Sequence, residues 1–576
     1  MKRPVSIRKN IWQIAPPVPA NLRHSLSHLH PILLQVLYNR GIVEPAHIQA
    51  FLEGRYLEKT DPFLLADMEK AVARILQAVA RQETVIVYGD FDADGVTSTV
   101  LLTEALRRLG LDRQKAQPYI PDRVDEGYGL NMEAITKLKA EKGADLIISV
   151  DCGIRSIAEV AHAQAIGVDM IVTDHHSLGA QLPPAVAIVN PKRPDSAYPE
   201  RMLAGVGIAY KLAQALQQAA PDADLDLTSL LDLVAIGTVA DLAPLLGENR
   251  KLVQDGLAVL NRAQRPGVAA LARVSGVRPG QMTAETIGFS LGPRINAAGR
   301  LDHAYLAARL LAVNNDLMAA DLANRLNILN KQRQKITADL AARAETQVAE
   351  GDPILIVQDP EFLSGVVGLV ASRLAEKAYR PAIVIERGEE ESRGSCRSIP
   401  EFHITEALDE VADLLVRHGG HAQAAGFTIC NRHLPEFIAR MQEIARGRLD
   451  GQALNPTLPI DGEISLADID WALQENLAQL EPTGYANTSP ILLSRDVEIV
   501  SHRRVGGDGA HLQLQLSAQN GEHGSSYRVL PAIAFRQGDW AEHLPQTIDV
   551  VYSVGVNEWN GRRSLQLMVQ DIQPAS

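Results

Sequence analysis

The sequence predicts an α/β protein with a long connecting helix and a small β-barrel at its C-terminal end. Between residues 70 and 250, short apolar runs alternate with segments of helical periodicity, which is typical of a parallel sheet with crossover helices. A helical pattern over residues 316–350 then leads to a second, smaller α/β unit. From about residue 455, short alternating strands with glycine-rich turns predict the barrel.

The first α/β segment is expected to contain three buried strands, each of which ends in acidic or histidine residues. The runs TVIVYGD, DLIISVD and DMIVTDHH are short and apolar, and helical patterns such as TSTVLLTEALRRLG separate them. Ligands bind beyond the carboxyl ends of parallel strands in such sheets. We therefore expect a functional site at the edge where these runs end.

The segment 316–350 is expected to form one helix that connects two domains. Its leucines and isoleucine recur at three- and four-residue spacing, which makes one apolar face. Asn315 or Asp316 can cap its start, and Gly351-Asp352-Pro353 ends the pattern. Such a helix would span about 50 Å at about 1.5 Å per residue. Beyond it, PILIVQD and PAIVIER are predicted strands on either side of a helix, SGVVGLVASRLAEK.

The 576 residues are too many for one core, so we divide the chain into several parts. The predicted parts are an N-terminal segment (1–45), the main α/β domain (46–255), a helical region with the connector (256–350), the smaller α/β domain (351–452) and the barrel (453–576).

Composition narrows the class of protein. Hydrophobic residues make up 46% and charged residues 22%, which excludes a disordered chain. We expect neither a membrane span nor a signal peptide, because no long apolar stretch is present. The three scattered cysteines argue against a disulfide framework and favour the cytoplasm. The net charge of −13 argues weakly against a nucleic-acid partner, because a local basic surface matters more than the total.

Three aspartates, Asp90, Asp92 and Asp94, stand at alternate positions after the first predicted strand, in YGDFDADGVTST. Alternate side chains of an extended backbone point the same way, so these carboxylates converge. They would raise one another's pKa unless a cation is bound between them. Gly95 lets the chain turn into the next helix. One such cluster alone is also compatible with an acidic surface turn.

The next two predicted strands end in Asp151-Cys152-Gly153 and in Asp174-His175-His176, and Asp241 follows another apolar run. An isolated histidine pair is usually a packing or surface feature. Three strand ends that carry such residues in order predict a site for two metal ions instead. Carboxylates and imidazoles suit Mn²⁺ or Mg²⁺, and the sequence has no thiolate set for structural zinc. Cys152 by itself is expected to be a small packing residue.

The series D-x-D-x-D-G, D-C-G, D-H-H and V-A-D-L-A-P-L resembles the four signature motifs of the DHH phosphoesterase superfamily. The resemblance implies hydrolysis of phosphoesters with two divalent metal ions. It also implies that His176 orients His175 or contacts the scissile phosphate, that Asp90 binds a metal or supports a ligand, and that Asp174 is structural. The implied metal ligands are Asp92, Asp94, Asp151, His175 and Asp241.

Further segments resemble the RecJ family of this superfamily and extend the resemblance over nearly the whole chain. They include RGIVEPAHIQAFL, IPDRVDEGYGLN, LEPTGYAN and VNEWNGRRSLQLMVQDI. The fold that this implies is a DHH domain, a DHH-associated α/β domain and a C-terminal OB-type barrel. Three short segments depart from the family pattern: Phe362-Leu363 stand where Trp-His is expected, Cys396 where Gly is expected, and Ala486-Asn487-Thr488 where Gly-Asn-Pro is expected.

Basic and glycine-rich segments supply the candidate DNA contacts that the resemblance implies. In GPRINAAGRL, Arg294, Asn296 and Arg300 can approach a phosphate, and Arg294 is also a candidate catalytic residue. A helix end with surface arginines is the alternative. The segments RGSCRSIP and HGGHAQAAGFTI offer side chains and backbone N–H groups to a phosphate backbone, and a tight hairpin with a packed histidine is the alternative. The candidate contacts in these two segments are Arg397, Ser398, Gly420 and His421.

The predicted barrel would bind a single strand through a basic groove and stacking aromatic rings. Tyr527 and Trp559 are the candidate stacking residues, although such aromatics are more often part of a core. The candidate basic residues are Arg503, Arg504, Arg562 and Arg563.

The resemblance implies an exonuclease that degrades single-stranded DNA from the 5′ end to mononucleotides, in repair and recombination. The 5′ polarity comes from the resemblance alone. One alternative is a phosphodiesterase for very short oligonucleotides or cyclic dinucleotides, whose relatives lack the barrel. Another is a non-catalytic scaffold, whose relatives lose the metal carboxylates. We expect a cytoplasmic monomer, with a single-strand-binding protein and a helicase as protein partners.

Overall fold

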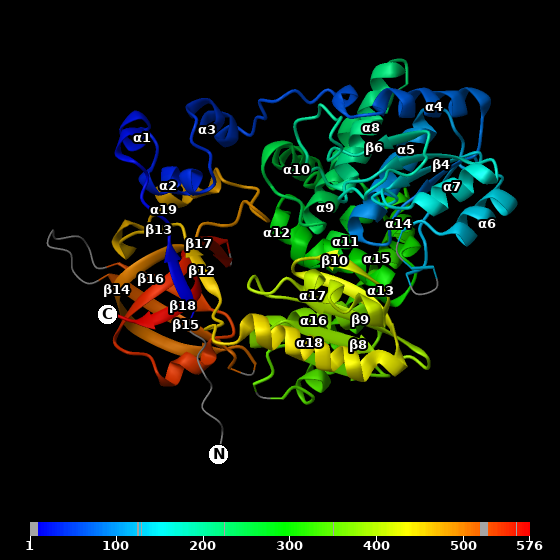
Figure 1. Ribbon diagram of the computed structural model, residues 1–576. Coiled ribbons are helices and arrows are strands. Elements are labelled where there is room, and N and C mark those ends of the chain that lie inside the picture. The colour runs from blue at the N-terminus through cyan, green and yellow to red at the C-terminus, as the bar shows by residue number, and fades with distance from the viewer. Residues whose placement is uncertain are drawn as a thin grey trace. The chain divides into compact units, whose positions relative to one another are not determined.

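The computed structural model describes residues 10–123, 126–127, 129–223, 225–349, 351–507, 509–518, 528–559 and 561–575. The chain divides into two compact units, one formed by Met1–Leu57 with Asn455–Ser576 and the other by Glu58–Leu454 (Figure 1). None of the described helices is both long and apolar enough to cross a membrane.

The larger unit contains a five-stranded parallel sheet in the order β3-β2-β4-β5-β6, which confirms the predicted parallel sheet. Its central strands β2 (Val85–Tyr88) and β4 (Leu146–Val150) are buried along their whole length, which explains their uniformly apolar sequences. The other strands are β3 (Ala116–Tyr119), β5 (Asp169–Thr173) and β6 (Ala187–Val189). The helices that connect and follow them are α4 (Met68–Arg81), α5 (Ala93–Arg108), α6 (Met132–Lys142), α7 (Ile157–Ala165) and α8 (Gly205–Ala219), with a short 3₁₀ turn η1 (Pro62–Leu64).

Helices follow the sheet and lead to the connector α15 (Asp316–Glu345). The Asn315 side chain caps this helix by accepting a hydrogen bond from the Met318 N–H, as its sequence suggests. The helix ends at Glu345, before the predicted end at residue 350. The elements between the sheet and the connector are η2 (Leu227–Leu230), α9 (Leu231–Ala240), α10 (Gly247–Leu260), α11 (Pro266–Val274), α12 (Ala284–Thr286), the π-helix η3 (Ile287–Leu291), α13 (Gly292–Leu301) and α14 (Tyr305–Ala312).

The second sheet of the larger unit has the order β10-β11-β9-β8-β7. β7 (Leu355–Asp359) and β8 (Ala382–Glu386) are parallel, and the other pairs are antiparallel, so this α/β domain has a mixed sheet. The remaining elements are α16 (Ser364–Ala378), β9 (Glu391–Arg397), α17 (Ile404–Asp409), η4 (Ala412–Leu414), β10 (Leu415–His421), β11 (Ala424–Cys430), η5 (Asn431–His433) and α18 (Leu434–Leu449).

The smaller unit contains the predicted barrel, in which β14-β15-β16-β18-β17 close through pairing of β17 with β14. Its N-terminal strand β1 (Ile11–Ile14) pairs in parallel with β12 (Thr457–Ile460), and the Trp12 Nε1 donates to the Asp571 carboxylate at 2.7 Å. Residues 1–57 therefore lie in the unit that carries the barrel. The other elements are α1 (Ala20–Ser25), α2 (Pro31–Asn39), α3 (Pro45–Leu52), β13 (Gly462–Glu463), η6 (Leu466–Asp468), α19 (Trp471–Ala478), β14 (Leu492–Val505), β15 (His511–Ala518), β16 (Val529–Ala534), η7 (Gly538–Glu542), β17 (Thr547–Trp559) and β18 (Arg562–Pro574).

Candidate active site

The loop from β2 to α5 carries the first three aspartates of the site. Asp92 is the N-cap of α5, and its Oδ1 accepts hydrogen bonds from the N–H groups of Asp94 (2.9 Å) and Gly95 (3.0 Å). A Cβ at position 95 would come within 2.6 Å of the Asp90 backbone, so only glycine allows this tight turn. The turn places Asp90 and Asp94 in buried positions near the sheet edge.

The N-terminus of α8 holds the Asp94 carboxylate. Its two oxygens accept from the backbone N–H groups of Val206 (2.8 Å) and Gly205 (2.7 Å). The positive end of a helix stabilises a carboxylate in this position. Gly205 also contacts the Asp151 side chain so closely that a Cβ there would lie 2.7 Å from that of Asp151. Helix α8 therefore packs directly against two of the candidate ligands.

Asp151 follows β4 with a backbone φ of +61°, a left-handed conformation that is strained for a residue other than glycine. This conformation turns its carboxylate toward the end of β5. There the Asp151 Oδ1 lies 3.0 Å from the Nε2 of His175. The local strain is thus maintained at a point where two candidate ligands meet.

The two histidines after β5 have different partners. His175 Nδ1 lies 3.8 Å from the Asp241 carboxylate, which the last turn of α9 brings to the site. His176 Nδ1 is 2.7 Å from Asp174 Oδ1, and the other Asp174 oxygen accepts from the Ile154 N–H. Asp174 thus supports the histidine loop, in agreement with the structural role that the resemblance implies for it.

The side chains fit divalent metal ions. Potential ligand atoms lie within 4.8 Å of one another in three groups, of which Asp90–Asp92–Asp151 and Asp94–His175–Asp241 share no member. The third group is Asp151 with the two histidines. Among the described residues, Asp90 Oδ1 has no hydrogen-bond partner, and Asp151 Oδ1 and His175 Nε2, which lie 3.0 Å apart, form no hydrogen bond with any other group. Buried polar atoms of this kind require a ligand, and hard oxygen donors with imidazole suit Mn²⁺ or Mg²⁺.

The electrostatics of the cluster without metal are unfavourable. Burial, followed by repulsion from Asp92, raises the pKa of Asp94 to about 7. Burial and repulsion from Asp94 raise the pKa of Asp241 to about 9 and that of Asp151 well above its usual range. Burial also lowers the pKa of His175 to about 3, which keeps this imidazole neutral and able to bind a metal. Burial alone would lower the pKa of His176, but the hydrogen bond to Asp174 and the negative charges of Asp174, Asp90 and Asp92 together raise it.

Four arginines of the larger unit form a cluster near these carboxylates, namely Arg123, Arg300, Arg333 and Arg397. Burial and then the positive charges of the other three lower the pKa of Arg300 to about 10, against the opposing effect of Asp92. Asp90 and Asp92 in turn act on Arg123, whose pKa burial lowers. Partly buried guanidinium groups that repel one another are stabilised by an anion, and phosphate is an anion that they bind well.

Helix α13 connects the metal cluster with the arginine cluster. The Asn296 Oδ1 accepts from the Ala93 N–H at 2.7 Å, and Arg300, one turn later, donates to the Gly365 carbonyl at 2.9 Å. Arg294 lies on another face of this helix. Its guanidinium donates to Ser290 O (2.7 Å) and Asn327 Oδ1 (3.1 Å). Asn296 therefore contacts the metal loop and Arg300 belongs to the arginine cluster, whereas Arg294 contacts η3 and α15, and a catalytic role for it stays a prediction.

Comparison with known proteins identifies the family. The model of the DHH family N-terminal domain matches residues 84–238, that of the DHHA1 domain matches 351–447, and that of the RecJ OB domain matches 460–571. The chain is 37% identical to the single-stranded-DNA-specific exonuclease RecJ of Bacillus subtilis, over 97% of this chain and 70% of the relative. The chain belongs to the RecJ family.

Other RecJ proteins match as fully. The Escherichia coli RecJ is 34% identical, with both chains covered completely. A crystal structure of Thermus thermophilus RecJ in complex with Mn²⁺ matches with a TM-score of 0.83 and 30% identity, over 98% of this chain and 80% of that one. These matches confirm the predicted fold class and the use of Mn²⁺ or Mg²⁺, since the same relative is also solved with Mg²⁺.

The DHHA1 candidates occupy β9 and the β10–β11 hairpin. Arg397 Nη1 donates to the Cys396 carbonyl at 2.7 Å and belongs to the arginine cluster. The Ser398 hydroxyl donates to the Phe402 carbonyl at 2.6 Å, which is a local structural bond. Gly420 allows close packing in the hairpin, since a Cβ there would lie 2.3 Å from the Ala424 carbonyl. His421 is exposed at the end of β10, so contact with a strand stays a prediction.

The barrel candidates belong to the smaller unit. Arg503 Nε donates to Gln513 Oε1 at 2.7 Å, and Arg562 is exposed at the start of β18. Arg563 lies over the Trp471 ring, 5.4 Å from its centre. Trp559 is the last residue of β17, but its side chain, like the whole of Tyr527, lies outside what the structure describes. The DNA-binding roles of these residues stay predictions.

The departures from the RecJ pattern have different surroundings. Phe362 is fully buried and Leu363 is exposed just before α16, so the first position is used for packing and the second is at the surface. Cys396 is buried in the second sheet. Ala486 has a φ of +60°, the left-handed conformation for which the expected glycine is better suited. None of these residues belongs to the three groups of potential metal ligands.

Two arginines of the cluster were missed from the sequence, Arg123 and Arg333. Arg123 follows β3, whose sequence AQPY is too polar to be recognised as a strand. If β3 had been recognised as a fourth strand, Arg123 would have been placed at the carboxyl ends of the strands, together with the aspartates. Arg333 lies on the connector α15 among other charged residues, and no local signal distinguishes it from a solvent-exposed arginine.

Proposed function

We propose that this chain is a 5′→3′ exonuclease that hydrolyses single-stranded DNA to 5′-mononucleotides, with two divalent Mn²⁺ or Mg²⁺ ions as cofactors. The observation that carries the proposal is the proximity of two charge clusters. Buried carboxylates that repel one another adjoin partly buried arginines that also repel one another. The first suits metal ions and the second suits a phosphate group.

The metal ligands follow from the two groups that share no member. Asp90, Asp92 and Asp151 would hold one ion, and Asp94, His175 and Asp241 the other. Ions bound there supply a Lewis acid for the scissile phosphate and a hydroxide nucleophile at neutral pH. The close packing of Gly205 and Gly95 holds these carboxylates in place before substrate binds.

We propose that His176 contacts the scissile phosphate or the leaving 3′-oxygen. Asp174 binds its Nδ1, which fixes the orientation of the ring, and the raised pKa extends the pH range in which the ring is cationic. A cationic imidazole stabilises negative charge on oxygen and can donate a proton to it. This role makes His176 a catalytic residue and Asp174 its positioning residue.

The arginine cluster supports the 5′ polarity. Arg123, Arg300 and Arg397 would bind the terminal 5′-phosphate, so that the next phosphodiester bond lies at the metal ions. Hydrolysis there releases one nucleotide that retains its 5′-phosphate. A terminal phosphate monoester carries more negative charge than an internal diester, which favours a chain end at a cluster of several cations.

Action on long strands distinguishes this function from hydrolysis of very short oligonucleotides. The barrel arginines Arg503 and Arg562 would bind the strand away from its end. Replacement of both by glutamate should weaken binding of a long strand and leave cleavage of a dinucleotide unchanged. Unchanged degradation of long strands would favour the short-oligonucleotide function.

The wider setting is also a proposal. Both charge clusters come from one chain, which supports action as a monomer. The three free cysteines support a reducing compartment such as the cytoplasm. A single-strand-binding protein and a helicase would supply the substrate strand. Analytical ultracentrifugation and pull-down with each purified partner test these points.

The decisive experiment is digestion of 5′-labelled and 3′-labelled single strands and of a blunt duplex, in Mn²⁺ or in EDTA. We expect immediate release of labelled mononucleotide from the 5′-labelled strand, no release in EDTA and little cleavage of the duplex. Early release from the 3′-labelled strand would overturn the polarity. Absence of all hydrolysis by folded protein would overturn the enzyme.

A further inference from the structure

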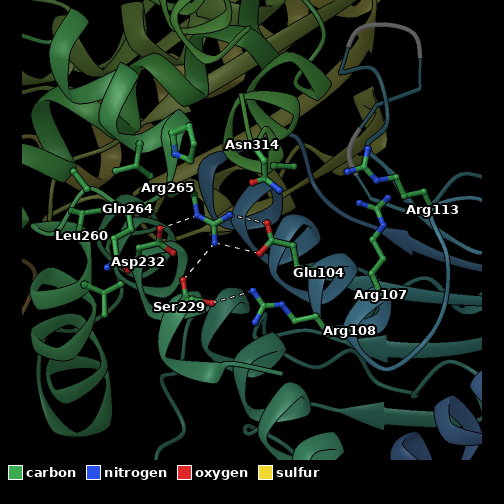
Figure 2. A pocket seen from close by; sticks show the side chains of 15 residues that line it. Glu104, Arg107, Arg108, Arg113, Ser229, Asp232, Leu260, Gln264, Arg265 and Asn314 are labelled. Atoms are coloured by element: carbon green, nitrogen blue, oxygen red, sulfur yellow. Dashed lines mark hydrogen bonds and ion pairs between the residues drawn. The ribbon is translucent and has the colours of Figure 1, made fainter. Parts of the chain in front are cut away.

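One cavity of the larger unit contains a charged network that is internally satisfied (Figure 2). The buried Arg265 binds the carboxylates of Asp232 (2.8 Å) and Glu104 (2.7 Å). Arg108 donates to the Leu225 carbonyl at 3.0 Å and lies near the Ser229 hydroxyl at 3.4 Å. Because these groups compensate one another, this cavity of about 320 Å³ is a structural feature rather than a binding site.

Two further arginines line one side of this cavity, Arg107 and Arg113, and unlike Arg265 they form no ion pair with a carboxylate among the described residues. Figure 2 shows the side chains of Arg107 and Arg113 extending toward one another, apart from Arg265. Burial and then the charge of Arg113 lower the pKa of Arg107, whose guanidinium donates to the Ala116 carbonyl at 2.9 Å. Both arginines also line a second cavity, of about 520 Å³. Arg107 and Arg113 therefore place two like charges on the wall that the two cavities share.

The second cavity is strongly basic although the whole chain has a net charge of −13. Within the described residues, none of its lysine and arginine side chains forms an ion pair with a carboxylate. Asp302, the single acidic lining residue, already accepts a hydrogen bond from the His303 N–H at 2.7 Å. The charged lining residues are Arg107, Arg113, Lys142, Arg309, Arg325 and Asp302.

Aromatic rings line the same cavity. Tyr305 is 40% exposed, and Tyr119 and His303 are also part of the wall. The rings of His303 and Tyr305 lie edge to face with centres 6.4 Å apart. The Tyr305 N–H donates to the Nδ1 of His303, which leaves the proton of the neutral ring on Nε2 as a further donor. Exposed rings next to unpaired cations match the base and the phosphate of a nucleotide.

We propose that this cavity is a second, non-catalytic binding site for a phosphate-bearing nucleotide, either a free nucleoside 5′-monophosphate or one nucleotide of a single strand. Its volume is within the range of small-molecule sites, which extends from about 300 to about 1,000 Å³. Binding there requires neither the metal ions nor hydrolysis, because none of the lining residues belongs to the metal cluster.

The position of the cavity suggests a consequence of binding. Asp302, His303 and Tyr305 directly follow α13, the helix whose Asn296 holds the metal loop and whose Arg300 belongs to the arginine cluster. A bound nucleotide would stabilise the end of α13. The second site would thereby stabilise the helix that links the two clusters of the active site.

The test is photo-crosslinking of the full chain in EDTA, with 8-azido-dAMP and, in parallel, with a short single strand that contains 5-iodo-deoxyuridine. Mass spectrometry then identifies the labelled peptides. We expect label on the peptide that contains Tyr305 or Tyr119. The double variant Arg309→Glu/Arg325→Glu should reduce this label by roughly 100-fold or more, because two charged contacts to phosphate are lost. Arg278→Glu, an exposed arginine outside the cavity, is the matched control and should leave it unchanged.

The outcomes separate the two sources of the ligand. Label from 8-azido-dAMP identifies a free nucleotide, and label from the strand alone identifies a bound strand. Absence of label from both, or label that the double variant retains while its circular dichroism is unchanged, would overturn the proposal. Exonuclease activity is measured separately in Mn²⁺, so a chain without hydrolysis would contradict the proposed function and leave the crosslinking result standing.

Discussion

The larger unit contains two buried clusters of charged residues that differ in one respect. In the Arg265 network, each carboxylate faces a guanidinium, and Asp232 and Glu104 are both bound. In the cluster of Asp90, Asp94 and Asp151, carboxylates repel one another, and no lysine or arginine among the described residues forms an ion pair with them. Asp232 is 4% exposed, close to the 1–3% of Asp90, Asp94 and Asp151, so for these aspartates the difference lies in compensation. A compensated cluster stabilises the fold, whereas an uncompensated one costs stability and indicates a missing ligand.

The largest effect should come from Asp151→Asn. Asparagine tolerates the left-handed backbone at this position but removes one negative charge from the cluster. We expect turnover to fall on the order of 10³-fold or more, as for groups that act as a unit. We also expect the metal-free variant to melt at a higher temperature, because repulsion is relieved. Strand binding should be retained.

Asp339→Asn, an exposed position on α15, is the control for this variant. Single-turnover kinetics and thermal melting in EDTA are the measurements. Turnover near the wild-type rate would remove Asp151 from the set of metal ligands, and a lower melting temperature would contradict the idea that the cluster is strained.

Arg265→Met should have the opposite effect on stability. It keeps most of the side-chain volume but leaves two carboxylates without their guanidinium, which should lower the free energy of unfolding by about 3–5 kcal/mol. Urea titration measures this. Arg108→Met, whose side chain is 35% exposed, is the control and should cost about 1 kcal/mol or less. A similar loss in both variants would show that the network is no stronger than a surface contact.

The stabilisation by metal should increase with pH. In the metal-free fold the pKa of Asp94 is raised to about 7 and that of Asp241 to about 9. A raised carboxyl pKa contributes stability below the unfolded pKa of about 3.9, and this contribution is lost as pH rises through 7 and then 9. Metal binding requires the deprotonated forms, so it reverses the loss.

Thermal melting in Mg²⁺ and in EDTA between about pH 5 and pH 9 tests this. At saturation the difference should approach about 3 kcal/mol, the value for ligand at about 100 times its Kd. In the Asp241→Asn variant, the stabilisation by Mg²⁺ should change little with pH at the upper end of this pH range. A difference that is independent of pH would argue against protons and metal competing for these carboxylates.

The smallest effect should come from Arg397→Ala. Loss of one charged contact to a terminal phosphate should lower kcat/KM about 10- to 100-fold for a 5′-phosphorylated strand. For a strand with a 5′-hydroxyl, kcat/KM should fall much less. Arg393→Ala, an exposed arginine on the same strand β9, serves as the control. Equal losses on both substrates would mean that Arg397 does not distinguish the chain end.

The fold class followed from local patterns, with informative exceptions. Strands β2, β4 and β5 were recognised because they are uninterrupted apolar runs. Strand β3 was missed because it is the outermost strand of the sheet and only partly buried, so its sequence, AQPY, is not an apolar run. The connector was predicted together with its Asn315 cap, since capping depends on neighbouring residues. The pairing of β1 with β12 had no local signal, because the two strands lie at opposite ends of the chain.

The sequence by itself determined which side chains follow each central strand, and therefore the composition of the metal cluster. Spacing and backbone period are local properties, and strand ends in a parallel sheet converge on one edge. Only the tertiary structure decided which distant residues join that cluster. Helix α9 brings Asp241 to His175, and Arg123, Arg300 and Arg397 meet from three separate elements. Such meetings depend on the packing of whole elements, which sequence periodicity does not encode.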